Sequence, residues 1–153
     1  MNLKEFVQLF VCFGLGLGAE ATDYTFNNSS GGNWSSSSNW TPTGVPGAAD
    51  RATIASGTYT VTLDVDATVT ALIVGGGTNR PTLNISVRTL TINSTGTMAP
   101  GGTLSLSGGT LTGAADVAVT GALNWTGGRG NGVRSIQLIL LKNDSATFWT
   151  PEG

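Results

Sequence analysis

The chain has 153 residues and a formal net charge of −2; only 10% of its residues are charged, 23 are glycine, one is cysteine and none is histidine. This length suits one domain with its own core, and the singly scattered basic residues form no positive stripe, which argues against a nucleic-acid partner. Glycine and short threonine-containing runs favour strands and tight turns over helices, so we predict an all-β chain.

Residues 1–21 have the three-part pattern of a secretory signal peptide. Lys4 lies in a short polar start, an apolar run covers 6–18, and Ala19-Glu20-Ala21 is a small-x-small cleavage site. The apolar run is short and glycine-rich for a membrane span, although an uncleaved anchor or a buried strand stays open. Cys12 lies inside this segment, so cleavage would leave no cysteine for a disulfide or a metal. We therefore expect a secreted or cell-surface protein without a membrane span after cleavage.

Residues 22–56 are polar and aromatic and contain two Asn-Trp pairs, at Trp34 and Trp40. A stack of repeats has an apolar end that must be covered. We predict an N-terminal aromatic cap in which both indoles cover the first repeat. The alternative for the same two residues is a glycan contact, because an exposed indole stacks well on a sugar face.

Residues 57–132 contain short alternating runs separated by glycine. Leu83 and Leu104 are 21 positions apart, as are Leu90 and Leu111. Three short strands per repeat of this length predict a right-handed parallel β-helix, or solenoid, of about four rungs. A β-sandwich is the alternative, but a sandwich has no reason to keep one spacing in several columns.

The period predicts three inward columns of apolar side chains. We expect them to be, in order, Val61/Leu63 with Leu83/Ile85, Leu104/Leu106 and Leu123/Trp125; Val69 with Leu90 and Leu111; and Met98 with Val119, Gly77 taking the equivalent place one repeat earlier.

The start of the chain resembles a known group of proteins. Gly32-Asn33-Trp34-Ser35, a second Asn-Trp, Val45-Pro46-Gly47 and the later Leu-Thr-rich turns are similar to the opening of secreted bacterial parallel β-helix repeat proteins, in the style of autotransporter passengers and surface adhesins. The resemblance covers Thr22 to about Gly132. It implies a right-handed β-helix with a structural or adhesive role, as the N-terminal segment of a longer protein.

Residues 133–153 leave the pattern, because they are dense in apolar residues and poor in threonine and glycine. We expect an irregular C-terminal tail, or a truncated end of a longer protein. A final strand with a terminal aromatic cap is the other interpretation. An uncapped end would favour end-to-end self-association through its unpaired strands.

Catalytic signals are weak. Asp64 and Asp66 have the spacing for one strand face but lie in an expected corner, where solvated turn acids are the simpler interpretation, and calcium would need more oxygen ligands than these two provide. Asp50 is expected to bond turn backbone. Without histidine a serine nucleophile lacks its usual base. We predict no enzyme, no cofactor and no metal site, with a polysaccharide-degrading β-helix as an alternative.

The remaining ordered feature is a threonine array. Two sets are each spaced by 21 residues, and would form a hydroxyl-methyl grid on one outer face: Thr68, Thr89 and Thr110, and Thr70, Thr91 and Thr112. This grid resembles the ice-binding face of β-solenoid antifreeze proteins, although threonine is also the usual solvent-facing β residue. The function we predict is a structural or adhesive module whose partner is an extracellular polysaccharide or a host or cell surface; ice binding and polysaccharide binding are the alternatives.

Overall fold

The computed structural model describes residues 20–133 and 135–138. Within that part the protein is all-β, with one 3-10 turn, η1 (Ser37–Asn39). The strands, in chain order, are β1 (Asp23–Phe26), β2 (Gly32–Asn33), β3 (Trp40–Thr41), β4 (Arg51–Ile54), β5 (Thr60–Thr62), β6 (Ala67–Val74), β7 (Thr82–Ile85), β8 (Thr89–Met98), β9 (Thr103–Leu106), β10 (Thr110–Thr112), β11 (Asp116–Val119), β12 (Ala122–Trp125), β13 (Arg129–Asn131) and β14 (Ser135–Leu138).

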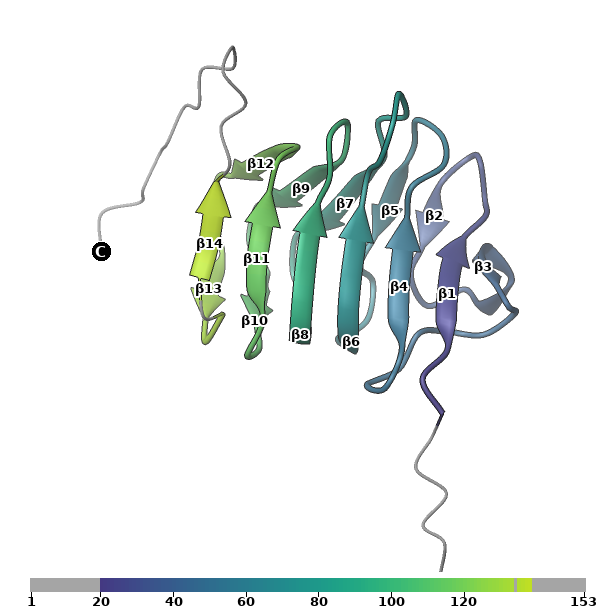
Figure 1. The fold of residues 1–153 in the computed structure, drawn as a ribbon, viewed down its shortest axis with the longest axis horizontal. Helices are drawn as coiled ribbons and strands as arrows, with labels where there is room; N and C mark the ends of the chain where they lie inside the picture. The colour runs from purple at the N-terminus through teal and green to yellow at the C-terminus, as the bar shows by residue number, and fades with distance from the viewer. Residues whose placement is uncertain (1–19, 134, 139–153) are drawn as a thin grey trace, which may run out of the picture.

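These strands wind into a parallel β-solenoid of about four turns (Figure 1). Each turn has three faces. Face A stacks β1, β4, the second half of β6, the second half of β8, β11 and β14; face B stacks β2, β5, β7, β9 and β12; face C stacks the first halves of β6 and β8, then β10 and β13. Among the described strands only β1 and β3 pair antiparallel. The predicted solenoid is confirmed over the sandwich, because a sandwich is built from antiparallel sheets.

The first predicted core column is confirmed on face B. Val61 pairs in register with Leu83, Leu83 with Leu104, and Leu104 with Leu123. Successive side chains of a strand alternate between core and solvent, and Val61, Leu83 and Leu104 are buried. The core-facing residues of this face are therefore those that the sequence predicts.

The other two predicted columns are wrong in their first member. Val69 pairs with Ile92 instead of Leu90, and Val74, not Gly77, pairs with Met98. Two short places in this turn explain the difference. The chain from Val61 to Val69 is one residue shorter than the paired chain from Leu83 to Ile92, and between Val69 and Ala71 β6 has one residue where β8 has two. Gly75, Gly76 and Gly77 lie in the following turn, where all three have positive φ, a conformation that glycine adopts without steric cost.

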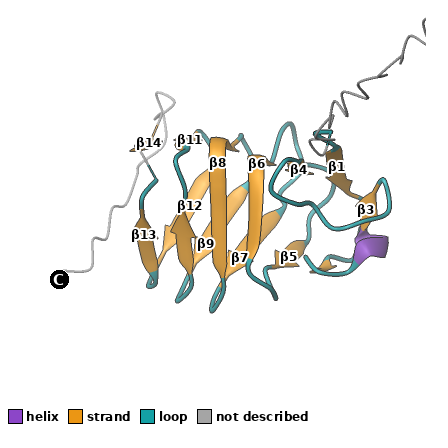
Figure 2. Cartoon of the chain, turned by 90° about the horizontal axis from the view of Figure 1, so that it is seen from below, coloured by secondary structure: helices purple, strands orange, loops and turns teal. Residues whose placement is uncertain are grey.

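An aromatic cluster closes the N-terminal end, as predicted. Phe26, Trp34, Trp40 and Tyr59 are all buried there. Trp40 meets Phe26 edge-on at 5.2 Å between ring centroids and Trp34 at 4.9 Å, and the Trp40 indole Nε1 donates to the Trp34 carbonyl at 2.8 Å. Strand β3 covers the free edge of β1, and η1 lies beside β3 (Figure 2). This cap removes a strand edge that would otherwise be open for pairing.

The solenoid extends beyond both of its predicted boundaries. β1 and β4 lie in the segment predicted as cap, yet β1 pairs with β4, and β4 with β6, in the ladder of face A. At the other end β14 pairs in parallel with β11, so the regular stack passes residue 132 and reaches Leu138. The predicted signal peptide, up to residue 19, and residues 139–153 lie outside the described residues. In the described part no helix is long and apolar enough to cross a membrane.

Candidate functional site

Face C carries five of the six threonines predicted to form an outward grid. Thr89 pairs with Thr110, and Thr91 with Thr112, in direct register across β8 and β10. Thr68 pairs with Thr91 instead of Thr89. The grid therefore has a row of three threonines, followed by Asn131, and a row of two, followed by Arg129.

Thr70 is not part of this grid, which corrects the prediction for the second set. It lies where the register of β6 against β8 shifts, as the single residue of β6 opposite Asn93 and Ser94 of β8. Its hydroxyl donates to the Ala48 carbonyl at 2.8 Å and its amide donates to the Asp50 carbonyl at 2.8 Å. Thr68 lies before this shift and pairs with Thr91 because the corner that leads into β6 is already one residue shorter than the next.

Face B carries two outward rows that the 21-residue spacing of threonines does not predict. The first row is Thr60, Thr82, Thr103 and Ala122; the second is Asn33, Thr62, Asn84, Ser105 and Asn124. All these residues are exposed or half-buried. Simple alternation about the correctly predicted column of Val61, Leu83 and Leu104 was the signal that could have found them.

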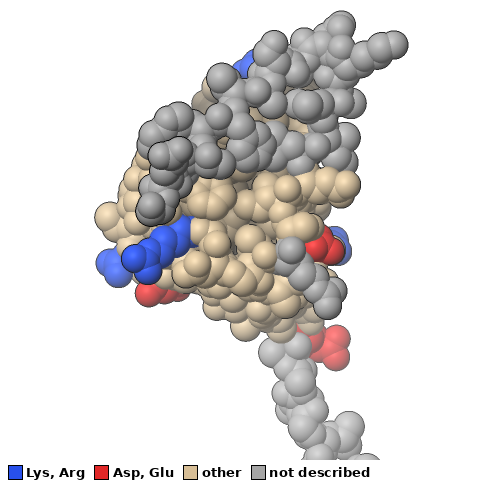
Figure 3. Space-filling view, turned by 90° about the vertical axis from the view of Figure 1, so that its left-hand side faces the viewer, with Lys and Arg blue, Asp and Glu red and all other residues tan. Residues whose placement is uncertain are grey.

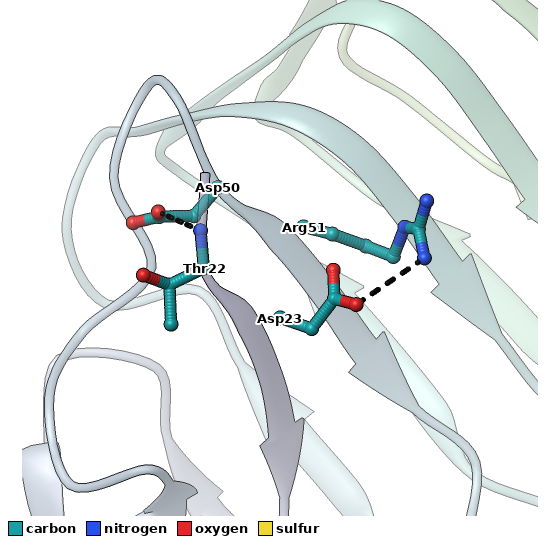
Figure 4. A network of polar contacts seen from close by, with 4 residues as sticks. All are labelled: Thr22, Asp23, Asp50 and Arg51. Carbon is teal, nitrogen blue, oxygen red and sulfur yellow. Dashed lines mark hydrogen bonds and ion pairs between the residues drawn. The ribbon is translucent and has the colours of Figure 1, made fainter. Parts of the chain in front are cut away.

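Face A is mixed in character. One outward row begins with Asp23 and Arg51, which form an exposed ion pair with 3.5 Å between the guanidinium and the carboxylate (Figure 4), and continues through Ala71 to Asp116. The next row includes the half-buried Ile73, between Thr53 and Thr97. Seen from the end of the solenoid at which the described chain finishes, charged side chains are few, and basic and acidic ones lie beside each other at two edges of an otherwise uncharged view (Figure 3).

Asp64 bonds to the preceding turn of the solenoid. Its carboxylate accepts hydrogen bonds from the Ser35 amide at 3.0 Å and from the Ser35 hydroxyl at 2.5 Å. Burial raises the pKa of Asp64, but the two hydrogen bonds from Ser35 and the charge of Arg88 outweigh burial, so that the pKa is lowered. The carboxylate therefore stays ionised and holds two turns together.

Asp66 bonds in the opposite direction, to the following turn. Its carboxylate accepts the Thr89 amide at 2.8 Å. At the equivalent place in the next two turns a backbone carbonyl accepts: Arg88 from Thr110 and Gly109 from Arg129, both at 2.9 Å. The Asp66 side chain thus substitutes for a carbonyl that the shorter first corner does not supply.

These contacts support the simpler interpretation of the corner acids. The two carboxylates bond backbone in different turns, and within residues 20–133 and 135–138 no three His, Cys, Asp or Glu side chains are grouped as metal ligands would be. Asp50 also bonds turn backbone, as expected: its carboxylate accepts a hydrogen bond from the Thr22 amide at 2.9 Å (Figure 4) and another from the Gly47 amide at 2.8 Å.

Trp34 and Trp40 lie in the cap with exposures of 0% and 1%. The two indoles meet edge-on, and Trp40 also meets Phe26 edge-on; because both rings are buried, they are not available for stacking on a sugar. The cap role is the one that the geometry supports for both residues.

Fold and surface together define a parallel β-solenoid with an aromatic N-terminal cap and outward rows of small polar side chains. No protein-family model matches the chain, and neither the search of curated proteins nor the search of solved structures found a match. The resemblance to secreted bacterial β-helix repeat proteins stays a prediction. The outward rows of faces B and C are therefore the basis for a functional proposal.

Proposed function

We propose that this chain is a non-catalytic secreted or cell-surface β-solenoid module with a structural or adhesive role. The observation that supports the proposal is the set of outward rows on faces B and C: in both rows of face B and in the Thr68 row of face C, Thr, Ser or Asn occupies the register position in three or more successive turns. Neighbouring strands lie about 4.8 Å apart, so the rows offer hydrogen-bonding groups at a fixed spacing.

The rows are also stiff, which favours recognition of a partner. Threonine is β-branched and has few χ1 choices, and each row is fixed by a continuous backbone ladder. A surface that is ordered before binding loses little conformational entropy when a partner binds. Secretion is supported by the signal-peptide pattern of residues 1–21.

Retention on surfaces tests the adhesive role. Beads coated with the full chain from Thr22 onward are washed over bacterial cells, animal cells, plant cell walls and biofilm matrix. We expect saturable retention on at least one surface, and none for beads that carry the heat-unfolded chain. Equal retention of both kinds of bead on every surface would contradict adhesion, and release of new reducing ends from any polysaccharide would contradict the non-catalytic part of the proposal.

Ice binding is the second candidate, and the register of face C favours it. The Thr89–Thr110 and Thr91–Thr112 pairs form a two-by-two grid on adjacent strands. Thermal hysteresis is the measurement. We expect ice shaping by the wild-type chain, its loss in the double variant Thr91→Lys and Thr112→Lys, and its retention in Thr97→Lys with Ala118→Lys, a matched adjacent pair on face A. A wild-type chain without hysteresis would end this candidate and leave the adhesive role untouched.

A further inference from the structure

Face B differs from the other two faces in charge. Its two outward rows contain Thr, Asn, Ser and one Ala, and no described residue in them is charged. Face A carries Asp23, Arg51 and Asp116 in one outward row, and one outward row of face C ends in Arg129. Face B is therefore the face whose described outward rows are uncharged, although Asp64, Arg80 and Arg88 lie in the turns at the ends of its strands.

The hydrogen-bonding groups of face B are uncommitted within the described structure. No hydrogen bond between described residues uses a side-chain atom of Thr60, Thr62, Thr82, Asn84, Thr103, Ser105 or Asn124. Hydroxyl groups donate and accept, and the Asn amides also do both. The rows can thus match a ligand that presents donors and acceptors in turn.

The geometry of the second row fixes the direction of such a ligand. It crosses five adjacent strands, from Asn33 in β2 to Asn124 in β12, which corresponds to roughly 19 Å at the usual strand spacing. A ligand that contacts the whole row must run along the solenoid axis, across the strands, and must repeat its polar groups at about the same interval. An extended polysaccharide has this form, with hydroxyl groups on every sugar.

Charge decides which polysaccharide fits. A uronate or an amino sugar would lose hydration over these rows and gain no counter-charge from the residues in them, which is costly. A neutral sugar exchanges hydroxyl–water hydrogen bonds for hydroxyl–protein ones at a much smaller cost.

We propose that face B binds a neutral, extended polysaccharide along the solenoid axis, with Thr62, Asn84 and Ser105 at the centre of the contact. This inference rests on the proposed adhesive function and names the partner class and the surface for it. The aromatic cap takes no part, since its rings are buried.

The test places charge on the face without touching the core. Asn84 and Ser105 are adjacent in register and half-buried, so the double variant Asn84→Asp and Ser105→Asp adds two negative charges to the middle of the row. Thr97→Asp with Ala118→Asp adds the same charge to an adjacent, half-buried pair on face A. Circular dichroism and the melting temperature establish that each full-length variant is folded.

The probes are cellulose, chitin, starch granules and agarose as neutral polysaccharides, and alginate and chitosan as charged ones. We expect the wild-type chain to bind at least one neutral probe and neither charged probe in a depletion assay. The face B variant should bind that probe at least about tenfold more weakly, and the face A variant within about twofold of wild type.

Several outcomes would overturn the inference. They are an absence of binding to every neutral probe, binding to the charged probes alone, equal weakening by the two variants, or loss of ice shaping or of self-association in the face B variant alone. Equal retention on a surface of beads coated with wild-type chain and beads coated with the face B variant would reject this inference but not the adhesive function. A lack of retention on every surface would reject the adhesive function itself.

Discussion

At the scale of single residues, aspartates join successive turns of this solenoid. Asp64 accepts from Ser35, Asp66 from Thr89, and Asp116 from the Ser135 hydroxyl at 2.8 Å. In each pair the two residues belong to neighbouring turns. Asp64 and Asp66 lie at corners, where the backbone ladder is interrupted, whereas Asp116 is in register with Ser135 at the start of β11. Hydrogen bonds to an ionised group are stronger than neutral ones, so these three acids stabilise contacts between successive turns.

Asp64→Asn should lower the free energy of unfolding by about 1 kcal/mol at neutral pH, because the partly solvated Ser35 contacts lose their charge assistance. The pKa of Asp64 is lowered in the folded state, so this stabilisation is present above the pKa of the unfolded chain and is lost as the pH falls through the folded pKa. Urea unfolding of wild type and variant across acidic pH measures the difference.

The matched control for this experiment is Asp23→Asn, which removes an exposed ion pair of small energetic value. The free energies of unfolding of wild type and Asp64→Asn should become equal at the lowest pH of the series. A difference in free energy that stays constant down to that pH would contradict the role of the ionised carboxylate.

At the scale of elements, the corners set the register of the strands. Gly113 follows β10 with φ of +124°, and a Cβ there would overlap the Ile92 carbonyl of the preceding turn. Gly76 has nearly the same φ, +126°, but a Cβ there would meet nothing within 4 Å. Both positions favour glycine for their backbone conformation, and Gly113 alone must also leave room for a stacked carbonyl.

Gly113→Ala should therefore destabilise the protein more than Gly76→Ala. We expect about 1 kcal/mol for Gly76→Ala from backbone strain alone, and about 1–3 kcal/mol more for Gly113→Ala from the overlap with backbone. Chemical unfolding of the two variants beside wild type gives both values, and equal losses would mean that the close stacking of the corners contributes nothing.

The corners also explain which parts of the fold the sequence could predict. The column Val61, Leu83, Leu104 and Leu123 was predicted although its spacing varies, because each residue lies in a clear alternating run. Thr68 was misplaced because the corner before β6 is one residue shorter than the next, and Thr70 because the register of β6 against β8 shifts there; neither feature leaves a mark on composition or alternation. The uncharged rows of face B were missed because their members differ in residue type, although alternation about the predicted column marks their positions.

At the scale of the whole molecule, each turn of the solenoid is stabilised by its contacts with the turns on either side. Each turn contacts only its neighbours, so an end without a cap weakens the adjacent turn first. The N-terminal end has its buried aromatic cluster. At the other end of the described stack, Leu123 and Trp125 are only half-buried, although the residues paired with them one turn earlier, Leu104 and Leu106, are buried. The two ends are therefore unequal in how well their last apolar layer is covered.

Trp40→Ala should destabilise the turns next to the cap more than the distant turns. It removes a fully buried indole and its hydrogen bond to the Trp34 carbonyl, which should cost about 3–5 kcal/mol. Hydrogen exchange should rise most in β2 and β5, next to the cap, and least in β9 and β12. Trp125→Ala, at the opposite end of the described stack, is the matched variant and should reverse that order, with a smaller loss because its side chain is only half-buried. Exchange that rises evenly along the solenoid in both variants would mean that the turns unfold as a single cooperative unit.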